Sequence, residues 1–172
     1  MSEHFSPAEI AALLGSAVAT IRAEVDALPK AVSTFHPADG EWSINEVIGH
    51  LIEAERRGFA GRIKILLASK DPQLEGWDQN EVARGRRDDM KTAAKLVAEL
   101  GRMRAESASL VRGLKAADLK RGGQHPKVGW LRVEDLLQEW VHHDRNHIKQ
   151  ILGNVQAWAW PHMGNSQKFA GE

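Results

Sequence analysis

Apolar residues recur every three or four positions through four long stretches of the chain, which is the spacing of one face of an α-helix. In the first stretch these positions are Ile10, Leu13, Leu14, Val18, Ile21, Val25 and Leu28. No convincing run shows the two-residue alternation that is typical of strands. We therefore expect helices at about residues 7–28, 44–68, 89–114 and 133–155.

Capping signals mark the start of the first two helices. Ser6 is followed three positions later by Glu9, and Ser43 is followed in the same way by Glu46. A serine with glutamate at this spacing forms a capping box, in which each side chain binds the other residue's backbone N–H. Prolines end both patterns, at residue 29 and at residue 72.

The segments between the predicted helices are rich in glycine, proline and charged residues. Residues 70–88 predict a long connection between helices two and three, with a short helix around Asn80–Arg84, and residues 122–126 break the chain before helix four. This pattern favours an all-α fold, a four-helix bundle. We expect a single domain over residues 1–172, with a core at about 6–158 and a C-terminal tail at 159–172.

Composition narrows the possible partners and compartments. The chain has 23 Lys and Arg against 23 Asp and Glu, so no positive excess is available to neutralise a phosphate backbone, and we expect no nucleic-acid partner. It has no cysteine, which excludes disulfides and thiolate metal sites. Residues 1–4 do not begin a signal peptide, and no window approaches the roughly 20 apolar residues of a membrane span. We expect a cytoplasmic protein without membrane association.

Three of the eight histidines lie on predicted helix faces that also carry apolar residues. His143 and His147 are four residues apart and project from one side of a helix, one turn apart. An unpartnered imidazole is costly in a core, and a shared metal ion would satisfy both. His50 is the candidate third ligand, because three nitrogen ligands leave a coordination position open. Such pairs also arise by chance, and a lone histidine on an apolar face is often a hydrogen-bonded core residue.

The segments around these histidines, residues 42–51 and 143–151, resemble the DinB/YfiT-like superfamily. The resemblance implies a four-helix fold in which His50, His143 and His147 bind one divalent metal ion.

The chain departs from the family pattern at two points. His142 stands beside His143, and Leu131-Arg132-Val133 replaces the common Ser or Thr cap of helix four. Because successive helical residues point about 100° apart, we expect His142 at the surface or behind the ligands.

Other residues near the two motifs are candidates for supporting roles. Asp144 and Gln150 could orient imidazoles or a bound water, and a solvated helix face is the plain alternative for both. Trp77, in the long connection, could wall a pocket above the metal, whereas packing at the core edge is its alternative role. Trp42 is expected to lock the start of helix two against the core.

The ligand set alone leaves the reaction open. An ion held by three imidazoles can activate water or stabilise a thiolate. The resemblance implies thiol-dependent transferases, a thiol-dependent isomerase or metal-dependent hydrolases. We favour a thiol S-transferase that acts on small electrophiles as its small-molecule substrates. Its cofactors would be zinc or nickel and a low-molecular-weight thiol.

Three alternatives differ from this hypothesis in class. They are a metal-dependent hydrolase, a non-catalytic, stress-associated metal protein that forms a homodimer, and a helical interaction domain without metal. A structural site would be closed by a fourth protein ligand, whereas an enzyme keeps a position open. Glu53, Asp78 and Glu81 are the acidic residues that could close the site.

Overall fold

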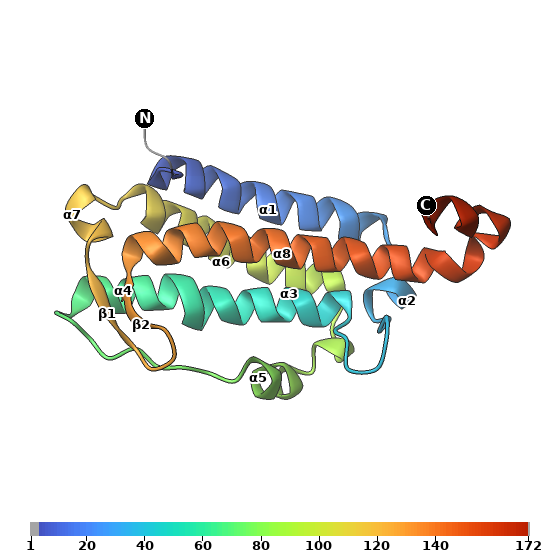
Figure 1. Ribbon diagram of the computed structural model, residues 1–172, viewed down its shortest axis with the longest axis horizontal. Coiled ribbons are helices and arrows are strands. Elements are labelled where there is room, and N and C mark those ends of the chain that lie inside the picture. The colour runs from blue at the N-terminus through green and yellow to red at the C-terminus, as the bar shows by residue number, and fades with distance from the viewer. Residues whose placement is uncertain (1–3, 172) are drawn as a thin grey trace.

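The computed structural model describes residues 4–171 and consists mainly of helices (Figure 1). Residues 1–3 and 172 lie outside the described residues. The predicted domain over residues 1–172 includes all of them, and the prediction that no signal peptide begins at residues 1–4 concerns the first three. The long helices are α1 (Pro7–Ala27), α3 (Ile44–Glu53) continued by η1 (Ala54–Phe59) and α4 (Ala60–Ala68), α6 (Ala93–Arg112) and α8 (Val133–Ala159). The shorter helical elements are α2 (Lys30–Ser33), α5 (Gln79–Arg86), η2 (Asp88–Met90), α7 (Ala116–Leu119), η3 (Trp160–His162) and η4 (Gly164–Gly171).

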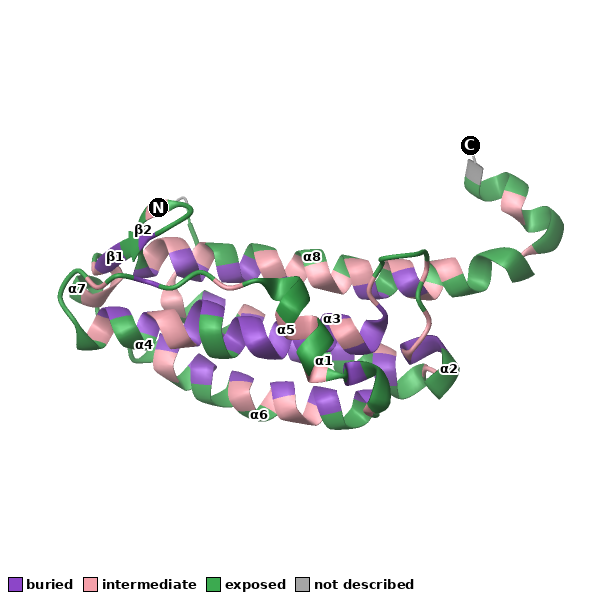
Figure 2. Cartoon of the chain, turned by 90° about the horizontal axis from the view of Figure 1, so that it is seen from below, coloured by how far each residue is buried: buried purple, intermediate pink, exposed green. Residues whose placement is uncertain are grey.

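The long helices form a four-helix bundle, as predicted. α1 packs against α6 and α8, and α3 packs against the same two helices, so that α1 and α3 lie diagonally opposite each other. α3 and α6 run in the same direction (Figure 1). The chain between them must therefore return along the whole bundle, and residues 69–92, including α5, make this return on the outside of α3 (Figures 1 and 2).

The capping signals at the first two helix starts are confirmed. Ser6 and Ser43 accept from the backbone N–H of Glu9 and Glu46, and both glutamates bind the serine N–H in return, at 2.8 Å. The first long helix ends at Ala27, one residue before the predicted limit.

The second long helix contains a π-helical segment, η1, which the spacing of apolar residues does not predict. Its inward residues Ala54 and Phe59 are five positions apart, and both are buried. The wider turn brings the backbone carbonyl of Arg56 close to residue 61. A Cβ atom at residue 61 would lie 2.0 Å from that carbonyl oxygen, so this position requires glycine.

Two further helix bounds need correction. α6 begins at Ala93 after the N-cap Thr92 rather than at residue 89, because residues 88–90 form a separate 3-10 turn. α8 continues to Ala159, four residues beyond the predicted end, and the tail that follows it forms 3-10 turns beyond the bundle (Figure 1).

Strands are present, contrary to prediction. β1 (Gly122–His125) and β2 (Gly129–Arg132) form an antiparallel hairpin in which Gly122 pairs with Arg132, and the positive φ of Gly129 permits its turn. The backbone of Gln124 also binds Pro72 and Leu74 of the connection. The hairpin thus ties the start of this connection to α8.

Two apolar clusters fill the bundle, and buried polar side chains lie between them. On α6, Arg104 lies between Leu100 of one cluster and Ala108 of the other. On α8, His143 and Asp144 lie between the two clusters in the same way. The functional candidates therefore occupy the middle of the fold.

The connection is fixed to α3 at Gly49, and this contact generates a prediction. Asp88 is buried and ion-paired with Arg86 and Lys91, at 2.7 and 2.8 Å. A Cβ at residue 49 would lie 1.8 Å from the Asp88 carboxylate. Gly49→Ala should lower the free energy of unfolding by about 2–3 kcal/mol through overpacking, as measured by urea denaturation.

Gly153→Ala is the matched control. Gly153 lies within α8, and its Cβ would meet nothing within 4 Å. Alanine should therefore raise stability there by up to about 1 kcal/mol through helix propensity. Equal stability of the two variants would contradict the proposed contact between Gly49 and Asp88.

Candidate metal centre

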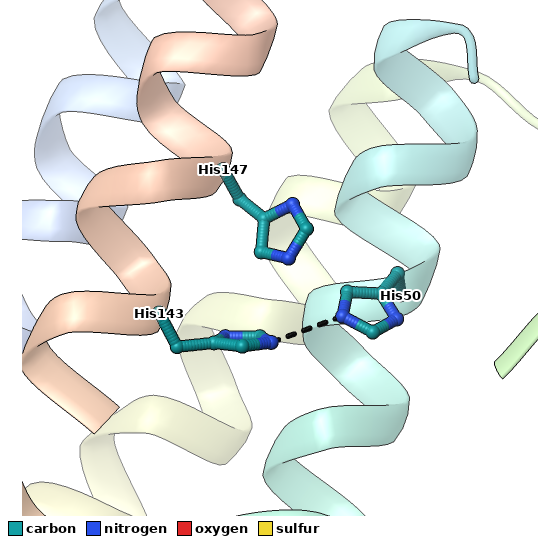
Figure 3. A group of neighbouring side chains, drawn as sticks. All are labelled: His50, His143 and His147. Carbon is teal, nitrogen blue, oxygen red and sulfur yellow. Dashed lines mark hydrogen bonds between the residues drawn. The ribbon is translucent and has the colours of Figure 1, made fainter. Parts of the chain in front are cut away.

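The structure brings His50, His143 and His147 together between α3 and α8 (Figure 3). The ring centroid of His50 lies 5.1 Å from that of His143 and 4.6 Å from that of His147. The two rings on α8 are 4.5 Å apart, as their four-residue spacing requires. His50 is almost fully buried, and the other two are half-buried.

The geometry of the imidazoles suits a shared divalent ion. One nitrogen of each ring lies within 4.8 Å of the others, and Nε2 of His50 is 3.0 Å from Nε2 of His143 (Figure 3). Two nitrogens bound to one tetrahedral zinc ion would lie about 3.3 Å apart, given bonds of about 2.0–2.1 Å. Nδ1 of His147 donates to Oε1 of Gln150 at 2.9 Å, which leaves its Nε2 unprotonated.

Burial keeps these imidazoles neutral, the form that binds metals. It lowers the pKa of His50 to about 3, with a further contribution from His147. It also lowers the pKa of His143 to about 3, assisted by the neighbouring histidines and Arg104. The pKa of His147 is lowered by burial as well, although Gln150 and Asp144 oppose this shift.

Aromatic rings surround His50 and His143. Trp42 and Trp77 lie on His50 with centroid distances of 5.0 and 5.8 Å, and the Trp77 ring is stacked on the imidazole. Phe59 presents its ring to His143 at 5.1 Å. Trp77 thus lies beside the three histidines and also packs against the apolar core, so its role as a pocket wall stays a prediction. The Trp42 carbonyl also accepts from Asn154 at 2.8 Å, which ties the start of α3 to α8.

The other candidates on α8 have different surroundings. Gln150 binds His147, as an orienting residue would. His142 is exposed and pairs with Asn146 at 2.9 Å, away from the three converging rings. Asp144 makes no hydrogen bond to these rings, and instead it pairs with Arg104, with Oδ2 2.5 Å from Nη1. The hydrogen bonds of Asp144 are thus to Arg104 and do not orient the imidazoles, contrary to the predicted role.

No acidic side chain among residues 4–171 joins the three histidines as a ligand. Glu53 is buried but held by Arg56, Arg57 and Arg86.

The remaining two acidic candidates lie at the start of α5. Asp78 caps this helix by accepting from two backbone N–H groups, and Glu81 is exposed on its first turn.

A buried ionic cluster that the sequence pattern does not predict lies next to the site. Arg104 lies between Asp144 and Glu55, with its Nε 3.1 Å from Oε2 of Glu55. All three side chains are at most 3% exposed. Burial raises the pKa of Glu55 to about 7, although Arg104 opposes the shift. Arg104 also lies over the Trp140 ring, which stacks on Phe59.

The fold, the site and the sequence comparison agree on a family. Residues 6–151 match the model of the DinB superfamily. This chain belongs to the DinB superfamily. The matched range includes all three histidines and the four long helices up to residue 151 of α8.

Similar proteins carry related descriptions. The chain is 28% identical over 125 residues to "Putative metal-dependent hydrolase YfiT" of Bacillus subtilis, a match that covers 71% of this chain and 68% of that protein. It is 22% identical to "Putative metal-dependent hydrolase OB0782" of Oceanobacillus iheyensis, covering 70% and 69%.

The solved structure of YfiT from Bacillus subtilis is described as "a probable metal-dependent hydrolase with an unusual four-helix bundle topology". It superposes with a TM-score of 0.82 over 93% of both chains, at 21% identity. This similarity confirms the four-helix fold of the chain.

Metal content should depend on His143. The purified full chain, without a histidine tag, should hold about one divalent ion by elemental analysis, and His143→Ala should hold almost none because it removes one of three ligands. His142→Ala should retain the ion, since its ring faces away. Gln150→Ala should weaken binding by about 10–100-fold. Full metal content in His143→Ala would contradict this ligand assignment.

The buried Glu55 should make stability fall with rising pH. Its pKa is raised from 4.5 to about 7 on folding, so the folded state binds more protons in that interval. The favourable contribution is fully present below pH 4.5 and is lost as the pH rises through 7. Relative to Glu55→Gln, the metal-free protein should lose up to about 3 kcal/mol between pH 4.5 and 8 in urea denaturation. Parallel stability curves would contradict the raised pKa.

Proposed function

We propose that this protein is a metal-dependent hydrolase whose divalent ion is held by His50, His143 and His147. The convergence of three imidazoles, with no acidic ligand beside them in residues 4–171, carries the proposal. Three protein ligands leave a position open for a substrate, as in catalytic rather than structural sites. Zinc or nickel suits imidazole ligands. Such an ion acts as a Lewis acid and lowers the pKa of coordinated water.

The protein's own residues would orient the ligands and limit access of water. Gln150 fixes the ring of His147 by accepting its Nδ1–H. Trp42 and Trp77 pack against His50, and the pocket that borders the site is lined by Trp42 and His147. Glu53 is occupied by three arginines and is therefore unsuited to act as a base.

The names of the relatives support hydrolysis as the reaction class. The thiol S-transferase activity and the low-molecular-weight thiol stay predictions, and no contact of the described residues favours them. The homodimer and the cytoplasmic location also stay predictions. No helix of residues 4–171 combines the length and apolar character that a membrane crossing requires.

Hydrolysis should require both the ion and its ligands. We expect the zinc-loaded chain to cleave members of a panel of small chromogenic esters and amides, and a chelator followed by zinc to abolish and then restore the rate. Loss of a hydrogen-bond partner of a metal ligand lowers activity by up to roughly 100-fold. His143→Ala removes a ligand itself and should lower the hydrolysis rate by more than this, whereas His142→Ala should leave the rate unchanged.

Parallel assays with added thiols and a chromogenic electrophile separate the two reaction classes. If the rate of product formation depends on both the thiol and His143, the protein is a thiol transferase and the proposal of hydrolysis is wrong. Equal rates for wild type and His143→Ala in every assay would remove the enzymatic proposal.

A further inference from the structure

A pocket of about 270 Å³ opens beside His147, and Trp42 forms one of its walls. It lies between the loop before α3, the first turn of α5 and the face of α8. Its lining residues are Gly40, Glu41, Trp42, Gln79, Asn80, His147 and Gln150. Its volume lies near the lower end of small-molecule sites, which suits one polar group of a substrate that reaches the metal.

Among the side chains that line this pocket, one is ionised at neutral pH. None of its lining side chains is Lys or Arg, and its ionised group is the exposed carboxylate of Glu41. The buried arginine of α5, Arg86, is directed to α3 and is occupied by Asp88 and Glu53, each at 2.7 Å. The charge of the proposed metal ion is met by the metal-binding end of the ligand, so the lining acts on the distal end. An anionic distal end would meet the carboxylate of Glu41 there and no lysine or arginine of the lining.

Amide groups supply the remaining polarity. Gln150 uses its carbonyl oxygen on His147, which directs its NH₂ group to other acceptors. Gln79 and Asn80 are exposed on the first turn of α5 and carry both donors and acceptors. Such a lining can bind ammonium, hydroxyl or carboxamide groups.

We propose that this pocket admits the uncharged or positively charged polar end of a small substrate and rejects carboxylate and phosphate ends. Glu41 is the specificity-determining residue, which favours an ammonium group over a neutral amide. The proposal rests on the proposed function, because the pocket acts only on molecules that reach the metal. The proposal also implies that a cosubstrate rich in carboxylates does not bind with these carboxylates in the pocket beside His147.

Three hydroxamates of equal length test the proposal. Each carries the same metal-chelating end, and the distal end is an ammonium, a carboxamide or a carboxylate. Binding to the zinc-loaded full chain is measured by titration calorimetry, so that no turnover is needed. The ammonium compound should bind most tightly and the carboxylate compound least tightly, at least about fivefold weaker than the carboxamide.

Variants of the lining assign the effect. Glu41→Gln should remove the roughly two- to fivefold advantage of ammonium over carboxamide, the size expected of an exposed charge pair. Gln79→Lys should improve the carboxylate compound selectively. Glu106→Gln, an exposed change on α6 that does not line this pocket, should leave all three affinities unchanged.

The two levels of the proposal fail in different ways. If none of the hydroxamates binds the zinc-loaded chain, an accessible metal centre is absent and the proposed function falls. If all bind equally, or the carboxylate compound binds most tightly, the substrate class is wrong while the metal centre stands. Unchanged selectivity in Glu41→Gln would overturn the role of Glu41.

Discussion

A band of buried ionisable side chains crosses the middle of this bundle, and its members contact one another from different helices. His50 faces His143 and His147, and Arg104 bridges Glu55 and Asp144. A buried polar group without a partner costs several kcal/mol by the larger estimates. α3, α6 and α8 therefore have few ways to pack, because sliding one helix would separate several pairs at once.

The four long helices could be predicted because each buries a stripe with the helical period. The π segment could not be found by a rule that assumes this period throughout, although the five-residue step from Ala54 to Phe59 is its signal in retrospect. The hairpin was missed because each strand has four residues and β1 begins with two glycines. Its stability comes from contacts with distant residues such as Pro72.

The candidate site was more predictable than its surroundings. The spacing of His143 and His147 determines that they share a face, and the apolar neighbours of His50 indicate that it points inward. Pairing across helices has no such local signal. Asp144 therefore looked like a partner of the adjacent histidine, whereas it is held by Arg104, forty residues earlier in the chain. Glu55 is buried because the π segment turns it inward.

The histidines on α8 follow His50 by 93 and 97 residues. The three imidazoles therefore meet only when α3 and α8 have packed against each other, and nothing local to either helix assembles the site. A divalent ion bound by all three would cross-link two helices that are distant in sequence, and its binding free energy would add to the stability of the folded bundle.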